Sequence, residues 1–247
     1  MSGILKDRVA FVTGGTGAIG QALVRVFSRE GARVAYSYHE QAGRAVELDG
    51  ELARSGFEVH SYPLDVLDGP GATALAERVE AEVGPVSVLV NNAGVTQVMP
   101  FALIEEEDWD RVLDVNVKGL FLVTKAFIRG MIRRRQGSIV NLGSLAGTRV
   151  LDVPVHYATA KSAVLGFTLS LAKEMSRYKI RVNAVIPGLL TEGVSANVPE
   201  REREEYLRYC TLSRAGRPEE VAELVAFLAS DRSSYINAQA IAIDGGI

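Results

Sequence analysis

Short apolar runs rich in β-branched residues alternate along the whole chain with longer segments of helical periodicity. A strand, a helix and a second strand in succession require a crossover connection, which makes neighbouring strands parallel. Strands that are apolar along their whole length suit a sheet covered on both faces. We therefore expect an α/β fold with a doubly wound parallel sheet of seven strands. The candidate strands are 8–13, 33–37, 58–62, 86–91, 138–142, 181–186 and 240–243, and the helix-length segments between them include 19–30, 69–83, 109–135, 157–176 and 218–230.

The alternation runs without a break, which bears on the number of domains. No Pro/Ser-rich linker, charge block or internal repeat interrupts it, so we expect residues 1–247 to form a single domain. The least regular stretch, 188–212, is long enough to be a lid. A hydrophobic fraction of 47% is ample for one large buried core.

Charge and composition exclude several classes of function. With 27 basic and 30 acidic residues there is no overall basic field for nucleic acid. The single cysteine, Cys210, and three scattered histidines exclude a disulfide scaffold and a cysteine-cluster metal site, so we expect no metal. The chain has neither an apolar leader at its start nor the run of about 18 apolar residues that a membrane span needs. We expect a cytoplasmic protein without a membrane partner.

The first strand runs into a glycine-rich loop, Thr13-Gly14-Gly15-Thr16-Gly17-Ala18-Ile19-Gly20, and then into a helix. Glycines let the backbone turn sharply and approach a pyrophosphate, while the helix N-terminus offers free N–H groups and the positive end of its dipole. Such a loop can also be a tight turn with no ligand. Its position in the first strand-helix unit favours a dinucleotide. The expected contacts are Gly14, Thr16, Gly17, Ala18, Ile19 and Gly20.

A tyrosine and a lysine open the helical segment that begins at residue 157. Tyr157 and Lys161 are four residues apart, so they lie on one helix face, and a nearby ammonium lowers the pKa of a phenol by stabilising phenolate. Alone, the pair could be an ordinary surface pair. Ser144 lies thirteen residues earlier, at the end of the strand 138–142, and ligands bind at the carboxyl ends of strands in open α/β sheets. These three residues are the candidate catalytic group.

The loop, Asn91-Asn92-Ala93-Gly94, Ser144 and Tyr157-Ala158-Thr159-Ala160-Lys161 follow one another in the order typical of the short-chain dehydrogenase/reductase family. The chain resembles this family from about residue 8 to residue 246, and within it the 3-oxoacyl-[acyl-carrier-protein] reductases and acetoacetyl-CoA reductases. The resemblance implies a Rossmann-like fold, a nicotinamide cofactor and a fourth catalytic residue, Asn116. Ala18 is a departure, because the family pattern has glycine there.

The resemblance also implies a mechanism, the NADPH-dependent reduction of a 3-oxoacyl thioester to the 3-hydroxyacyl thioester. Tyr157 would donate a proton to the carbonyl oxygen, which Ser144 positions. Lys161 would bind the nicotinamide ribose and lower the pKa of Tyr157, and Asn116 would hold a water that passes protons on from Lys161. Two alternatives stay open: a ketoreductase or alcohol dehydrogenase for a polyketide, aromatic or other secondary ketone, and a non-catalytic binding subunit with the same fold.

The end of the second strand indicates which nicotinamide cofactor is used. An NAD site of this kind carries Asp or Glu there to bind the ribose 2'-hydroxyl, but this chain has Tyr38. A neutral, polar pocket of Ser37, Tyr38 and His39, with help from Arg44, would accept a 2'-phosphate. We therefore expect NADP(H). NAD(H) is the alternative if Glu40 or another acid fills the role.

Further cofactor contacts follow from the resemblance. They are Asp65 and Val66 beside the adenine, Asn92, Ala93 and Gly94 along the cofactor, and Pro187, Gly188 and Leu190 around the nicotinamide. Asp65 could instead be a helix N-cap. Similar reductases usually have Thr five residues after the proline, whereas here Glu192 occupies that place and Thr191 precedes it.

Substrate and partner features are less specific. The segment 145–156 is rich in Leu and Val, which suits either an apolar mouth for an acyl chain or simple packing. In similar reductases basic residues contact an acidic carrier protein or CoA phosphates, although helix C-termini favour arginine in any case. The family also implies a homotetramer. The candidate carrier contacts are Arg133, Arg134, Arg135, Arg177 and Lys179.

Overall fold

Seven strands form one sheet in the computed structural model, which describes residues 3–247. Every pairing between neighbouring strands is parallel, and the order is β3-β2-β1-β4-β5-β6-β7. The prediction of a doubly wound parallel sheet is confirmed. The strands are β1 (Val9–Val12), β2 (Arg33–Tyr38), β3 (Val59–Pro63), β4 (Val88–Asn91), β5 (Gly137–Leu142), β6 (Ile180–Pro187) and β7 (Ala240–Ile243).

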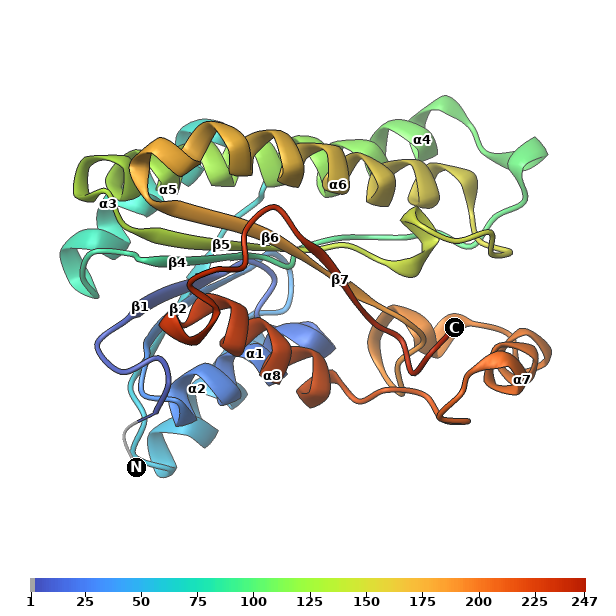
Figure 1. The fold of residues 1–247 in the computed structure, drawn as a ribbon, viewed down its shortest axis with the longest axis horizontal. Coiled ribbons are helices and arrows are strands. Elements are labelled where there is room, and N and C mark those ends of the chain that lie inside the picture. Colours follow the sequence, from blue (N-terminus) through green and yellow to red (C-terminus); the bar gives the residue numbers. More distant parts are fainter. Residues whose placement is uncertain (1–2) are drawn as a thin grey trace.

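Helices cover both faces of the sheet (Figure 1). In this view α3, α4, α5 and α6 lie above it, α1, α2 and α8 lie below it, and α7 lies apart, near the C-terminus. The α-helices are α1 (Ala18–Arg29), α2 (Ala42–Arg54), α3 (Gly69–Glu82), α4 (Glu106–Leu113), α5 (Leu120–Arg134), α6 (Val155–Met175), α7 (Glu200–Tyr209) and α8 (Pro218–Ala229). The shorter helical turns are η1 (Phe101–Leu103), η2 (Asp114–Gly119), η3 (Leu145–Gly147), η4 (Ser176–Tyr178), η5 (Gly193–Asn197) and η6 (Asp231–Ser233).

The expected helix 109–135 is interrupted. It consists of α4, the π-helical turn η2 and α5, with η2 around Asn116. The sequence did not predict this interruption, because the apolar residues continue with helical spacing into α5, where they are buried. π-Helical turns are rare in proteins overall, but those that occur are frequently at functional sites.

Side chains of successive strand residues enter two separate cores, one on each face of the sheet. On β1, Ala10 and Val12 belong to the core beneath α1, α2 and α8, whereas Val9 and Phe11 belong to the core beneath α3, α5 and α6. The Phe11 ring stacks on Phe127 of α5 with 4.2 Å between centroids. Burial on both faces explains why these strands are apolar throughout.

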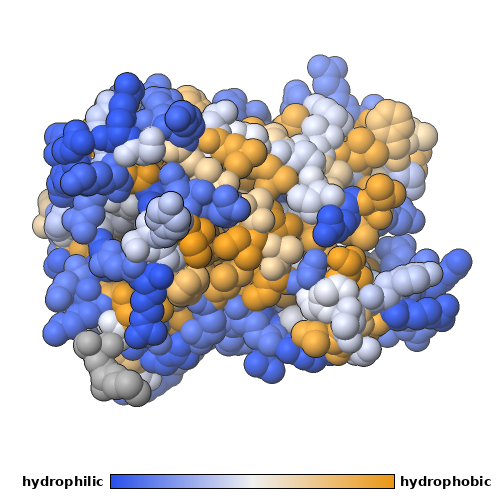
Figure 2. Space-filling view, viewed as in Figure 1, coloured by the Kyte–Doolittle hydropathy of each residue, from blue (hydrophilic) through white to orange (hydrophobic). Residues whose placement is uncertain are grey.

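The sheet edge at β7 is less covered than the centre. Residues of β7 alternate between exposed and half-buried, while those of β1 and β4 are fully buried. Figure 2, viewed from the same side, shows hydrophobic residues gathered across the middle of this face, where β7 runs in Figure 1.

The strand order reverses between β1 and β4, which are neighbours in the sheet but far apart in the chain. Loops that leave the carboxyl ends of these two strands diverge to opposite faces, and the crevice between them is where open α/β sheets bind ligands. The glycine-rich loop follows β1, and Asn92, Ala93 and Gly94 follow β4. The topology therefore brings both predicted motifs together.

Candidate active site

Hydrogen bonds tie the glycine-rich loop to the turn that follows β4. The Thr13 hydroxyl accepts from the backbone N–H groups of Asn92 and Ala93, each at 2.9 Å. The Asn92 side chain donates to the carbonyl oxygens of Thr13 and Gly14 at 2.9 and 3.0 Å. Thr13 was not singled out from the sequence, and it is the residue that joins the two motifs.

The loop leaves little or no room for a side chain at three of its glycines, and a Cβ on Gly15 would collide with the Tyr36 ring. Gly14 has φ +65°, and a Cβ there would lie 3.0 Å from the Ala93 Cα. A Cβ on Gly20 would collide with the Gly14 carbonyl oxygen. Thr16, which is buried, accepts from the Gln21 side chain at 2.9 Å and so completes the turn. The loop is thus a preformed concave backbone cradle of the kind that receives phosphate groups.

The departure at Ala18 fits this cradle. Ala18 is the first residue of α1, and Ile19 is the second, so the methyl group lies on the helix rather than inside the loop. Gly17, at the N-cap, is exposed, and the helix has no side-chain cap. The first N–H groups of α1 are therefore free to bind an anion.

The side chains of Asn116 and Lys161 both approach the backbone of Gly94. Asn116 is buried, and its side-chain amide donates to the carbonyl oxygens of Val95 and Val112 at 2.8 Å each. Its Oδ1 is buried without a hydrogen-bond partner. A Cβ on Gly94 would lie 2.6 Å from that Oδ1 and 3.4 Å from the Lys161 Nζ. Glycine is needed here because both polar groups approach the same backbone position.

Lys161 is 6% exposed, and its ammonium donates to the Leu142 carbonyl oxygen at 3.0 Å. Burial lowers the pKa of Lys161 to about 8. The same group lies 5.7 Å from the centroid of the Tyr157 ring. The i,i+4 prediction that these two side chains share one face of α6 agrees with this geometry.

Burial raises the pKa of Tyr157, and hydrogen bonding to Ser144 opposes this rise only in part. The net direction for the pKa of Tyr157 is therefore upward, in contrast to the lowering expected from Lys161. The Ser144 hydroxyl is at the N-cap of η3 and accepts from the Ala146 N–H at 3.2 Å.

His156 was not singled out from the sequence. It is fully buried beside Tyr157 in the first turn of α6, where the N-cap residue, Pro154, provides no side-chain cap. Its Nδ1 accepts from the Tyr157 backbone N–H at 2.9 Å, and its Nε2 is buried without a partner. An acceptor at Nδ1 places the proton of a neutral imidazole on Nε2. His156 therefore caps the helix turn that carries Tyr157.

A chain of buried amides and hydroxyls supports the sheet beneath these residues. The Asn91 amide donates to Thr124 of α5 at 2.9 Å and to Asn141 of β5 at 2.8 Å. Asn141 donates in turn to Thr168 of α6 at 2.9 Å, and Thr168 donates to the Val164 carbonyl oxygen. This network joins two strands and two helices that carry candidate residues. Only Asn91 was noted from the sequence, as part of a motif.

The predicted adenosine end lies beyond β2 and β3. Ser37 is buried in β2, Tyr38 ends that strand half-buried, and His39 is exposed. Asp65 is exposed, and its carboxylate accepts from the Leu67 N–H at 2.9 Å. The alternative that Asp65 caps α3 is wrong, because Asp68 is the N-cap and accepts from Gly71. Val66 contacts the chain at Gly119, where η2 ends.

The predicted nicotinamide contacts lie in the segment that follows β6. Pro187 ends β6, and Gly188 donates to the Ile243 carbonyl oxygen at 3.0 Å. Leu190 is buried, and its N–H donates to the Ser195 hydroxyl at 3.1 Å. The Tyr206 hydroxyl accepts from the Leu189 N–H at 3.1 Å and donates to the Asp244 carbonyl oxygen at 3.2 Å.

Thr191 and Glu192, which depart from the family pattern, are both exposed. The Thr191 N–H donates to the Gly216 carbonyl oxygen at 2.9 Å. The next residue, Gly193, reaches the start of α1, because a Cβ on it would lie 3.2 Å from the Ala18 Cβ. The stretch 188–212 is thus anchored at several points and carries η5 and α7.

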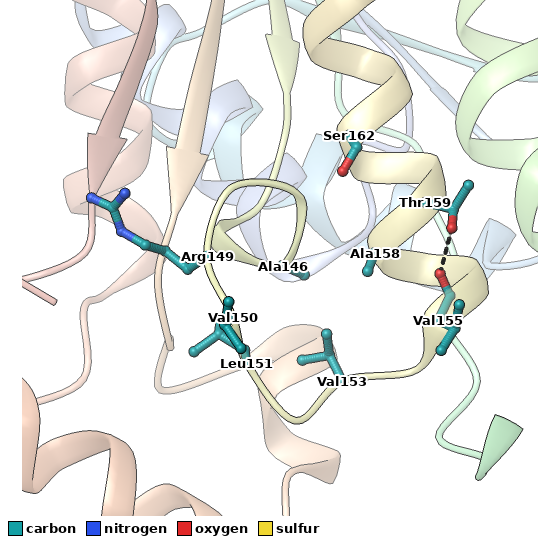
Figure 3. A pocket seen from close by; sticks show the side chains of 9 residues that line it. All are labelled: Ala146, Arg149, Val150, Leu151, Val153, Val155, Ala158, Thr159 and Ser162. Carbon is teal, nitrogen blue, oxygen red and sulfur yellow. Dashed lines mark hydrogen bonds between the residues drawn. The ribbon is translucent and has the colours of Figure 1, made fainter.

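The segment 145–156 borders a cavity of about 440 Å³ (Figure 3). Its other wall is the face of α6 that carries Ala158, Thr159 and Ser162, and in the figure Arg149 points away from α6. At about 100° per residue, Ser162 lies roughly 140° around the helix from Tyr157. This cavity therefore opens on the side of α6 away from the Tyr157 hydroxyl.

The predicted basic cluster lies at the amino edge of the sheet, where α5 and α6 end and β5 and β6 begin. Arg133 and Arg134 contact Glu80 at 3.7 and 2.8 Å, and Arg135 donates to the Arg177 carbonyl oxygen at 2.7 Å. Lys179 adopts a left-handed conformation, φ 57°, immediately before β6. The 21 residues of α6 separate this edge from Tyr157 by about 30 Å.

Within residues 3–247, none of the helices is long and apolar enough to cross a membrane. Within the same residues, no group of three or more His, Cys, Asp and Glu side chains could hold a metal ion.

Comparisons with known proteins agree with the fold and with the family that the sequence resembles. A family model described as "Enoyl-(Acyl carrier protein) reductase" matches residues 14–247. The "3-oxoacyl-[acyl-carrier-protein] reductase FabG" of Thermotoga maritima is 40% identical over 246 residues, 98% of each chain, and that of Chlamydia muridarum is 36% identical over the full length of both. The solved structure of a short-chain dehydrogenase/reductase from Serratia marcescens superposes with a TM-score of 0.91 at 31% identity, over 98% of each chain.

Proposed function

Because this chain belongs to the short-chain dehydrogenase/reductase family of oxidoreductases, we propose that it reduces a 3-oxoacyl thioester to the 3-hydroxyacyl thioester with NADPH. The observation that carries the proposal is the convergence of Ser144, Tyr157, Lys161 and Asn116 at the carboxyl edge of the sheet. The names of the relatives support the thioester, since two of them are 3-oxoacyl reductases.

The cradle fits a dinucleotide. The crowded positions of Gly14 and Gly20, and the free N–H groups at Ala18 and Ile19, suit a pyrophosphate. Lys161 would bind the nicotinamide ribose, with Gly94, Pro187, Gly188 and Leu190 bordering the ring. When bound, the nicotinamide supplies the hydride for the carbonyl carbon.

Proton transfer then falls to the chain's own residues. Because burial raises the pKa of Tyr157, its phenol stays protonated at neutral pH and can donate to the carbonyl oxygen. Ser144 would donate a second hydrogen bond to that oxygen and stabilise its developing charge. Lys161, with a pKa of about 8, is the stronger acid of the pair and would return a proton to the Tyr157 oxygen. The unpartnered Asn116 Oδ1 would accept from a water that reprotonates Lys161.

The choice of NADP(H) rests on the end of β2. Tyr38 occupies the position of the acid that would repel a 2'-phosphate, with the exposed His39 beside it.

Tyr38→Asp should shift the ratio of kcat/KM for NADPH over NADH toward NADH by about tenfold or more, because the carboxylate repels the phosphate and accepts from the 2'-hydroxyl. Initial rates with both cofactors measure the ratio, and an unchanged ratio would place the specificity residue elsewhere.

Carrier recognition would fall to basic residues at the amino edge of the sheet. The basic residues Arg133, Arg134, Arg135, Arg177 and Lys179 would serve a carrier docked on one copy of the chain while its arm reaches the site of another, because α6 separates them from their own Tyr157. This arrangement requires an oligomer, and we propose a homotetramer in the cytoplasm. Light scattering of the purified protein tests the assembly.

The function is tested by NADPH and NADH oxidation at 340 nm with three substrates: acetoacetyl-CoA, a larger aromatic β-ketothioester and crotonyl-CoA. Turnover of acetoacetyl-CoA with NADPH supports the proposed reaction. Turnover of the larger ketone alone would assign the chain to another ketoreductase reaction. Turnover of crotonyl-CoA alone would favour the enoyl reduction named in the family description. Cofactor binding without any turnover would indicate a non-catalytic relative.

A further inference from the structure

A second cavity, of about 360 Å³, lies between the turn after β4, α4 and the segment after β6. Its volume falls within the range of small-molecule sites. Its lining combines apolar side chains, two uncharged polar side chains and one cation. The lining residues are Val95, Thr96, Gln97, Arg111, Val112, Gly193 and Val194.

This cavity adjoins the candidate active site directly. The Asn116 amide donates to the carbonyl oxygens of Val95 and Val112, which belong to two of its walls. Asn116 Oδ1 and Lys161 Nζ both approach Gly94, one residue before Val95. The remaining wall, Gly193, also lies against Ala18 at the start of α1. The cavity therefore adjoins the residues that we propose transfer protons, Asn116 and Lys161.

Arg111 is the single charged residue of the lining. It is exposed, and within residues 3–247 it takes part in none of the ion pairs, whereas Arg25 pairs with Glu51 and Arg134 with Glu80. Asp114, one turn further along the same segment, is paired with Lys118 at 3.3 Å. The Arg111 guanidinium thus presents its N–H donors to a ligand, and its planar fork suits phosphate.

We propose that this cavity holds the pantetheine arm of the thioester and that Arg111 binds the phosphate at the end of that arm. The inference rests on the proposed function. Val95, Val112 and Val194 would contact the methyl groups of the arm, and Thr96 and Gln97 would hydrogen-bond its amides. The phosphate is common to CoA and to a carrier protein, so one arginine serves either source. Arg111 is thereby a specificity residue at the same sheet edge as Tyr157.

The test compares two thioesters that differ in the phosphate alone, with acetoacetyl-CoA as a third substrate that adds the nucleotide. Steady-state kcat/KM is measured for acetoacetyl-pantetheine, acetoacetyl-4'-phosphopantetheine and acetoacetyl-CoA with the unaltered protein, Arg111→Gln and Arg149→Gln. Arg149, the matched control, is an exposed arginine that lines the cavity on the other side of α6. Arg111→Gln should lower kcat/KM about tenfold more for the phosphopantetheine thioester than for the pantetheine thioester, and Arg149→Gln should lower both equally.

Each other outcome decides against the inference. Equal losses on the two pantetheine thioesters would assign Arg111 a structural role. A selective loss with acetoacetyl-CoA alone would assign the guanidinium to the nucleotide phosphates instead of the arm. If Arg149→Gln shows the selective loss, the arm lies in the other cavity. If the unaltered protein reduces none of the thioesters but does reduce a simple ketone, the proposed function fails and this inference fails with it.

Discussion

The Asn116–Lys161 site and the segment 188–212 lie side by side at one sheet edge but are built in different ways. Asn116 and Lys161 are 2% and 6% exposed, and backbone carbonyl groups from distant parts of the chain hold them. The segment 188–212 exposes Val194, Tyr209 and Leu212, and a few hydrogen bonds, such as those of Tyr206, anchor it. Changes in the first region should therefore act on rate and folding, and changes in the second on binding.

The largest effect is expected from Tyr157→Phe. It removes the proposed proton donor while keeping the ring, so kcat should fall about 100-fold or more, with the dissociation constant for NADPH within about twofold. Stopped-flow reduction and fluorescence titration separate the two quantities. Near-normal turnover of this variant would show that Tyr157 is not the proton donor.

Lys161→Met should separate activity from stability. Below about pH 8 the folded chain buries an ammonium, and between about pH 8 and 10.5 the unfolded chain binds more protons than the folded one. The contribution of Lys161 thus makes the unfolding free energy rise with pH across this window. The Met variant should lose activity, gain up to ~3 kcal/mol at pH 7 and lose that pH-dependent rise.

Urea unfolding of both proteins at pH 7 and pH 10 measures the difference. A Met variant that is less stable than the unaltered protein at pH 7 would show that the ammonium is stabilised by its surroundings, contrary to the burial argument.

A smaller effect is expected at His156, which acts on Tyr157 through the backbone. His156→Leu removes the acceptor and should lower kcat about tenfold, with KM for NADPH within about twofold, because the first turn of α6 loses its cap. His156→Asn places an oxygen near the position of Nδ1 and should restore at least half of kcat. Equal activities of the two variants would show that packing alone matters.

The smallest effect is expected in the segment 188–212. Tyr206→Phe leaves the Leu189 N–H and the Asp244 carbonyl oxygen without this partner, so KM for NADPH should rise about threefold while kcat changes little. Tyr209→Phe, on the exposed face of the same helix, is the control and should change neither. A fall in kcat with Tyr206→Phe would mean that this segment also positions the reacting groups.

Features carried by residues near one another in sequence could be predicted. The strands are short runs of apolar residues, and the pair Tyr157 and Lys161 follows from helical spacing alone. The family resemblance added Asn116 but not the π-helical turn that carries it, because the apolar pattern continues from α4 into α5. Helix α7 was also missed, since its sequence is mostly charged and has no apolar stripe.

Features that depend on distant contacts could not be predicted. Thr13 meets Asn92 across 79 residues of sequence, and Asn141 meets Thr168 across 27, so neither partner marks the other locally. The arginines at 133–135 are a further example. Their charge is evident from the sequence, but the edge of the sheet at which they lie depends on the direction in which α5 runs.

The buried chain from Asn91 through Asn141 to Thr168 also constrains how the protein assembles. A strand displaced by one residue turns its side chains to the opposite face, so a slip of β4 or β5 would set an amide against apolar neighbours. The correct pairing gives the Asn91 side-chain NH2 group two acceptors and gives the Asn141 side chain one donor and one acceptor, and each neighbouring misalignment leaves these groups without partners in the dry interior. These polar residues therefore favour one register between β4 and β5. This matters in a parallel sheet, because its neighbouring strands are far apart in sequence.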